Sequence, residues 1–133
     1  MARGGLGFEG IGAKYVTVQA AGSVSAVALA SGVAYVEGKA VTCEGDGLFG
    51  FGSAGDALRG IIDRYEKDHY MTVQFAGFKE NVPGVSGALP AAKEYLVVDG
   101  SGAVSEVATP VNGAYAVEVD GTADVNVVTV FIG

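Results

Sequence analysis

Few side chains in this chain are suited to catalysis or metal binding. It has one histidine, His69, one cysteine, Cys43, and no tryptophan. A metal site or a catalytic dyad at His69 would need a partner cysteine or a second histidine, and neither lies near His69 in the sequence. Cys43 is expected to be a small residue of the hydrophobic core. We therefore predict no catalytic residues, no metal ligands and no cofactor, and we expect the protein not to be an enzyme.

The glycine pattern of dinucleotide-binding loops, G-x-G-x-x-G, occurs twice, at residues 5–10 and 50–55. Chance matches are expected in a chain with 22 glycines. The first match follows no predicted strand, and the second lacks the repeated strand–helix–strand units that place a helix N-terminus beneath a pyrophosphate. We reject both as nucleotide sites.

The composition favours short strands joined by tight turns. Valine outnumbers leucine by 21 to 6, and valine fits a pleated sheet better than a helix. Glycines and Asx-Gly pairs recur every 8 to 12 residues, which is typical of sandwiches and barrels. We predict an all-β fold, a small β-sandwich or a β-barrel of the β-tulip kind, with residues 14–133 forming one β-rich domain behind an extended N-terminal arm at residues 1–13.

Alternating apolar residues and turn signals define the expected strands. They are residues 14–20, 24–29, 33–36, 40–43, 48–51, 94–98, 103–107, 114–119 and 126–132. Residues 79–90 have the composition of a loop, and residues 99–102 that of a tight hairpin turn.

Residues 56–69 fit two interpretations. Apolar residues at helical spacing and Asp56 as a cap favour a short helix. Gly60 and two adjacent isoleucines oppose it, because glycine costs a helix about 1 kcal/mol relative to alanine. We prefer a hairpin with strands at 60–65 and 70–75 and a charged tip at 66–69, which is either simply solvated or a contact surface for a charged partner.

The net charge of −7 argues against nucleic acid and anionic membranes as partners. The longest apolar-rich stretch, residues 24–36, is too short for a membrane helix, which needs about 20 residues. No secretory signal is visible, and a lone cysteine permits no intrachain disulfide, so we expect synthesis and folding in a reducing cytoplasm.

The N-terminal arm combines five glycines at positions 4–12 with three large apolar residues, Leu6, Phe8 and Ile11. Such a segment cannot hold a regular element by itself. It either clamps onto a neighbouring subunit or packs back on its own domain. As a clamp it would place Arg3, Leu6, Phe8, Glu9 and Ile11 at a partner interface.

Three segments, GII at 60–62, TVQFAG at 72–77 and EYLVVDGSGAV at 94–104, resemble the small decoration or cement proteins of tailed bacteriophage capsids. The bias toward glycine, alanine and valine and the acidic charge are similar too. The resemblance implies a β-rich knob, often trimeric, that binds the lattice of the major capsid protein on the virion exterior and staples neighbouring subunits against internal pressure. It supplies no catalytic residues.

Three other functions are compatible with the same patterns. A tail-tube or fibre module would polymerise or form elongated trimers. A β-barrel that binds a ligand or carbohydrate would need exposed aromatic residues for sugar stacking. An enzyme would need a nucleophile and a base within reach, and no persuasive pair is present.

Overall fold

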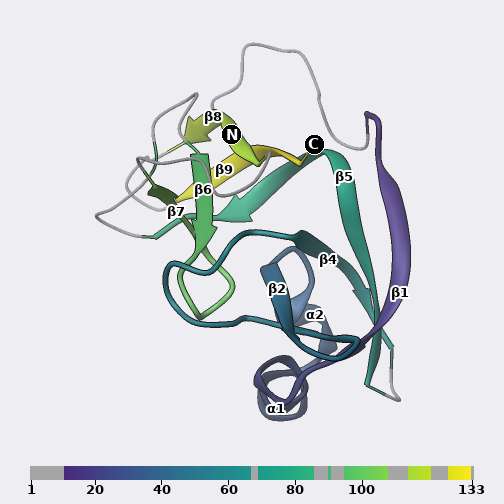
Figure 1. Ribbon diagram of the computed structural model, residues 1–133. Coiled ribbons are helices and arrows are strands. Elements are labelled where there is room, and N and C mark those ends of the chain that lie inside the picture. Colours follow the sequence, from purple (N-terminus) through teal and green to yellow (C-terminus); the bar gives the residue numbers. More distant parts are fainter. Residues whose placement is uncertain are drawn as a thin grey trace.

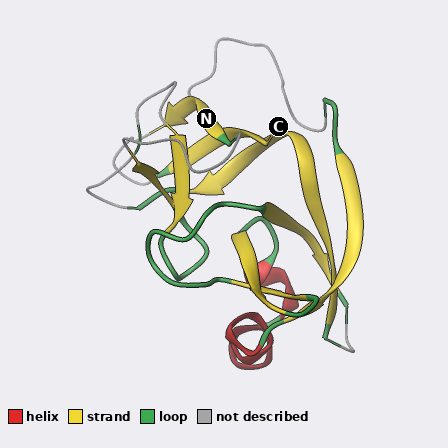
Figure 2. Cartoon of the chain, viewed as in Figure 1, coloured by secondary structure: helices red, strands yellow, loops and turns green. Residues whose placement is uncertain are grey.

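The computed structural model describes residues 11–66, 69–85, 90, 95–107, 114–120 and 126–132. The chain folds into an all-β architecture, as predicted, with a closed five-stranded barrel and additional strands (Figures 1 and 2). Its strands are β1 (Lys14–Ala20), β2 (Ala40–Gly45), β3 (Leu48–Gly50), β4 (Gly60–Tyr65), β5 (Tyr70–Pro83), β6 (Tyr95–Val98), β7 (Val104–Val107), β8 (Tyr115–Asp120) and β9 (Val127–Ile132). Two helices, α1 (Gly22–Ser31) and α2 (Val33–Val36), lie between β1 and β2.

The barrel consists of β1, β3, β2, β4 and β5, and it closes where β5 pairs with β1. All of its pairings are antiparallel except that of β1 with β3. A parallel pair needs a crossover connection between its strands, and such a connection usually contains a helix. Here α1, α2 and β2 connect β1 to β3, and the helices lie together at one end of the barrel (Figure 2).

Strand β5 is shared between the barrel and a second sheet. Its first half pairs with β1 and β4, and its second half, from Gly77, pairs with β9. The second sheet continues from β9 through β8 and β6 to β7. Gly77 has a φ of 92°, which other residues rarely adopt, so glycine at this position allows one strand to serve both sheets.

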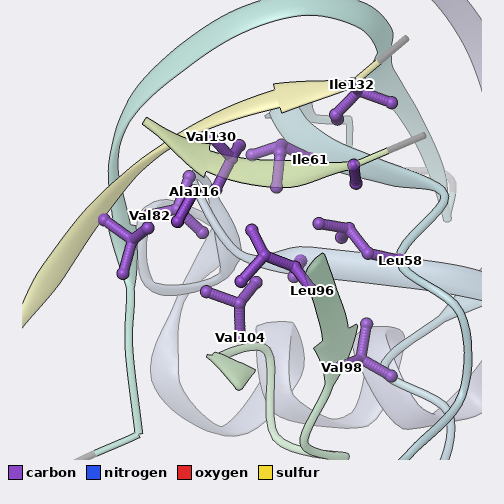
Figure 3. Packing of buried hydrophobic residues seen from close by; sticks show 12 residues of the cluster. Leu58, Ile61, Val82, Leu96, Val98, Val104, Ala116, Val130 and Ile132 are labelled. Atoms are coloured by element: carbon purple, nitrogen blue, oxygen red, sulfur yellow. The ribbon is translucent and has the colours of Figure 1, made fainter. Parts of the chain in front are cut away.

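Two hydrophobic clusters stabilise the fold. One joins the strands and helices of the barrel, with Val24, Val36, Ile62, Met71 and Val73 all fully buried. The other lies against the second sheet and draws Leu58 and Ile61 from the barrel side (Figure 3). Its labelled members in Figure 3 are Leu58, Ile61, Val82, Leu96, Val98, Val104, Ala116, Val130 and Ile132.

The predicted strands at 24–29 and 33–36 are wrong, because both segments are helical. The alternation of valine with serine and alanine suggested strands, but alanine is the strongest helix former and supplies three of the ten residues of α1. Val24 and Ala28, four residues apart, bury one face of α1. The crossover between two parallel strands favours this helical state, and the sequence around α1 does not reveal that pairing.

The predicted loop at 79–90 is also wrong in its first part, because β5 continues to Pro83. The register between β5 and β9 shifts between Lys79 and Val82, and Asn81 has a φ of 62°. The residues typical of a loop are accommodated at this irregularity, while pairing with β9 keeps the segment in the sheet. Proline is tolerated at Pro83 because it ends the strand.

The other expected strands are present with small changes at their ends. The predicted hairpin is confirmed, and the alternative helix at 56–69 is not formed. β4 and β5 pair antiparallel, with Ile61 opposite Gln74 and Tyr65 opposite Met71. The turn at 99–102 is confirmed too, with β6 and β7 paired on either side of it. The Asp99 carboxylate accepts hydrogen bonds from the backbone N–H groups of Ser101 and Ala103 at 2.8 and 3.0 Å.

Candidate interaction surfaces

The chain that leads into β1 is anchored at the bend of β5. The backbone N–H of Phe78 donates to the carbonyl of Ile11 at 3.0 Å. A Cβ added at Gly77 would lie 2.5 Å from the carbonyl carbon of Gly12 and 2.6 Å from the Ala13 nitrogen. Only glycine allows the two backbones to approach so closely. Residues 11–13 are therefore held at a defined point against β5.

Gln74 supports this bend from inside the protein. Its side chain is fully buried, and its Nε2 donates to the carbonyls of Ala76 and Phe78, both at 3.0 Å. The two carbonyls lie on either side of Gly77. Buried carbonyls need hydrogen-bond partners, so this one amide group stabilises the bent backbone on which the N-terminal segment rests.

Strand β1 presents an open edge next to that anchor. It pairs with β5 from Lys14 to Gln19, but with β3 only at Gln19 and Ala20. Among the described residues, the other edge of β1 from Lys14 to Val18 has no strand beside it, and β1 forms the right-hand margin of Figure 1. Unpaired strand edges are templates for another polypeptide segment.

Large apolar side chains are exposed along and just before this edge. Tyr15 and Val16 are about half exposed, as is Ile11 at the anchor. The edge carries one charged residue, Lys14, and natural sheet edges usually carry more charge to prevent association. The arrangement is suited to contact with a neighbouring chain.

A second apolar surface is formed by the helices, which we call the helical cap (residues 22–36). No charged residue occurs from position 20 to 36. Leu29 is 90% exposed, and Val33 and Tyr35 are exposed to 45% and 56%. Figure 1 places α1 at the lower end of the molecule, far from the N-terminal start of β1 at the upper right.

Polar contacts fix the cap on the barrel. Ser23, in the first turn of α1, donates from Oγ to the Glu44 carboxylate at 2.6 Å and accepts from the backbone N–H of Phe51 at 3.0 Å. Glu44 also accepts from the N–H of Gly52 at 2.7 Å. These bonds join α1, β2 and the segment after β3. The helix therefore has a fixed orientation even though it is uncharged.

A hollow of about 250 Å³ lies between the cap and the β4–β5 hairpin. Ser25, Leu29 and Val33 line it from the cap, and Tyr65 and His69 line it from the hairpin. The Tyr65 hydroxyl lies 3.2 Å from Nδ1 of His69. Burial raises the pKa of Tyr65 above 10.0, so its phenol is neutral over the physiological range.

The structure describes one of the five predicted interface residues. Ile11 is exposed at the anchor, as the interface hypothesis requires. Arg3, Leu6, Phe8 and Glu9 lie outside the described residues. Sequence reasoning missed the helical cap, because its residues were assigned to strands. The 17-residue run without charge was the signal that could have revealed it.

The structure corrects the expectation for Cys43, which is exposed and not part of the core. Only the first half of β2 is buried, and Cys43 lies in the outer half, where its thiol contacts the carbonyl of Gly45 at 3.1 Å. In the part of the chain that the structure describes, no three histidine, cysteine or acidic side chains are grouped to hold a metal.

The second G-x-G-x-x-G match lies between β3 and β4, and residues 51–59 contain no helix. Its glycines therefore have no helix N-terminus beside them to receive a phosphate. Neither of the described helices has the length and apolar character needed to cross a membrane. No protein-family model matches this chain, and a search of the curated proteins finds no match.

Proposed function

We propose that this chain is a structural virion protein, a capsid decoration or cement protein that binds the outer surface of an icosahedral phage shell. It would be made in the host cytoplasm and staple neighbouring major capsid subunits, most favourably as a homotrimer. The sequence resemblance at 60–62, 72–77 and 94–104 is the origin of this proposal.

One structural observation carries the proposal furthest. Ile11 is exposed, is held at the bend of β5 by the hydrogen bond from Phe78, and lies just before the open edge of β1. A cement protein needs such an arrangement, because an extended arm can lie across a neighbouring subunit only if its origin is fixed. Leu6, Phe8 and Ile11 are apolar residues that can serve as anchors on that neighbour.

Weak contacts by each copy are sufficient for this function. A repeating shell presents many equivalent sites, and linkage of copies in an oligomer raises the effective concentration at the next site. The acidic charge of −7 opposes non-specific association between copies. Binding would then depend on apolar anchors and backbone pairing more than on charge.

The test uses empty shells assembled from the major capsid protein of the phage or prophage that carries this gene. We expect the full chain to cosediment with these shells and a chain lacking residues 2–10 to lose most of its occupancy. This deletion retains Ile11, Gly12 and Ala13, so the anchor at Gly77 stays intact. Failure of the full chain to bind would contradict the proposed function, and unchanged occupancy of the truncated chain would contradict the role of the arm.

Point variants separate apolar anchoring from chain length. Leu6→Ser combined with Phe8→Ser should reduce occupancy nearly as much as the deletion. Tyr95→Ser is the matched control, because Tyr95 is also partly exposed but lies on β6 in the second sheet. An equal loss of binding in both variants would indicate a general effect of surface polarity.

A further inference from the structure

Leu29 is the most exposed large apolar residue among those the structure describes, at 90%. It lies at the rim of the 250 Å³ hollow between the cap and the β4–β5 hairpin. The same surface therefore carries a protruding apolar side chain and, beside it, an apolar depression. A contiguous exposed apolar surface of this kind marks an interaction site more often than a single exposed leucine does.

The charges around this surface indicate what kind of partner fits it. Its centre is neutral from position 20 to 36 in a molecule of net charge −7. Charges of both signs lie beside it: the Glu37 carboxylate accepts from the backbone N–H of Tyr65 at 3.2 Å, and Nζ of Lys39 lies 4.5 Å from the centre of the Tyr35 ring. Two copies with a net negative charge repel each other least when their uncharged surfaces meet. Charges of both signs around those surfaces can then pair across the contact.

We infer that the helical cap binds a second copy of this chain, with Leu29 of each copy inserted into the hollow of another. A cavity of about 150 Å³ accommodates a benzene molecule, so the hollow is large enough for a leucine side chain. Ser25 and Val33 would contact the inserted leucine from one side and Tyr65 and His69 from the other. This inference goes beyond the proposed function and holds whether or not the protein binds a shell.

Two symmetries satisfy this contact. Reciprocal exchange between two copies gives a two-fold dimer, and insertion of each Leu29 into the next copy gives a closed ring. A ring of three would agree with the trimer favoured above. A dimer would contradict the trimer but not the knob-and-hollow contact, so the two proposals fail separately.

The test measures mass against concentration by sedimentation velocity. We expect the full chain to form an oligomer. Leu29→Ser should weaken the affinity by about 10- to 100-fold per contact, because it removes the burial of a leucine side chain. Leu29→Glu should give monomers. Ser25→Phe should also give monomers by filling the hollow while Leu29 stays in place. Tyr95→Ser, which changes an exposed residue of β6 outside both apolar surfaces, is the control and should keep the mass of the unmodified chain.

A mixing experiment distinguishes this contact from general damage to the cap. Leu29→Ser lacks the knob but keeps the other residues that line the hollow, and Ser25→Phe fills the hollow but keeps the knob. Mixed together, they regain one intact contact per pair, so association should reappear. Circular dichroism of each variant checks that the helices remain. A monomeric full chain up to about 100 µM, an unchanged mass for Leu29→Glu, or no association in the mixture would overturn the inference.

Discussion

The close approach of residues 11–13 to Gly77 predicts that one added methyl group at Gly77 lowers the free energy of unfolding. In Gly77→Ala, the new Cβ would lie 2.5 to 2.6 Å from backbone atoms of Gly12, Ala13 and Ile11. Since real Cβ contacts stay beyond 3.0 Å, the segment must retreat by about 0.5 Å or more. That retreat breaks the hydrogen bond from Phe78 to Ile11, which contributes about 0.5–1.5 kcal/mol.

The dihedral strain of the same substitution can be measured separately. Gly55 has a φ of 95°, close to the 92° of Gly77, and a Cβ at Gly55 would meet nothing within 4 Å. Gly55→Ala therefore reports only the unfavourable backbone conformation, about 1–2 kcal/mol. We expect Gly77→Ala to lower the free energy of unfolding by about 1.5–3.5 kcal/mol in total, because the lost hydrogen bond and the backbone strain add.

The assay is urea denaturation of both variants beside the unmodified chain, with limited proteolysis of the N-terminal segment. Gly77→Ala should be the less stable variant by about 0.5–1.5 kcal/mol and should be cleaved faster near residues 11–13. Equal stability of the two variants would refute the argument, because it would show that the close approach of Gly12 to β5 contributes nothing beyond backbone strain.

Three further predictions concern single side chains. Gln74→Leu should lower the free energy of unfolding by about 1–3 kcal/mol in urea, because it removes the two hydrogen bonds that the side-chain amide donates to the carbonyls of Ala76 and Phe78; full stability would contradict the role of Gln74 at the bend. Ser23→Ala should cost about 1 kcal/mol by the same measurement, through loss of the bonds to Glu44 and Phe51. The raised pKa of Tyr65 means that the fold binds this proton more tightly than the unfolded chain does, so its stabilisation is complete below pH 10.0 and is lost as pH rises through the higher folded value. The melting temperature of Tyr65→Phe should therefore fall less from neutral to alkaline pH than that of the unmodified chain. An equal fall in both chains would show that ionisation of Tyr65 does not contribute.

Local patterns were sufficient for much of the strand assignment. The β4–β5 hairpin could be predicted because Gly60 and the paired isoleucines disfavour a helix, and a polar tip separates two apolar runs. The turn after β6 could be predicted for a similar reason, since the Asp99 carboxylate accepts hydrogen bonds from Ser101 and Ala103 within the same five residues. Interactions of such short range can be inferred from the neighbouring residues alone.

The exposed apolar surfaces could be predicted only in part. Ile11 was proposed as an interface residue from the composition of the arm, whereas Leu29 was assigned to a strand. Whether an apolar residue is a core residue or a contact residue depends on what packs against it, and that depends on segments distant in the sequence. Cys43 is the opposite case: it was expected in the core, but it lies on the exposed end of β2.

The amino-acid sequence by itself determined the all-β character, the tight turns and the acidic charge, because valine stiffness, glycine dihedrals and ionisation belong to individual residues. Only the tertiary structure decided the rest. It made α1 a helix through the crossover from β1 to a parallel β3, and it divided β5 between two sheets at Gly77. It left one edge of β1 open because the pairing with β3 ends after two residues. These features depend on pairings between distant strands, whose free energy no single stretch of sequence contains.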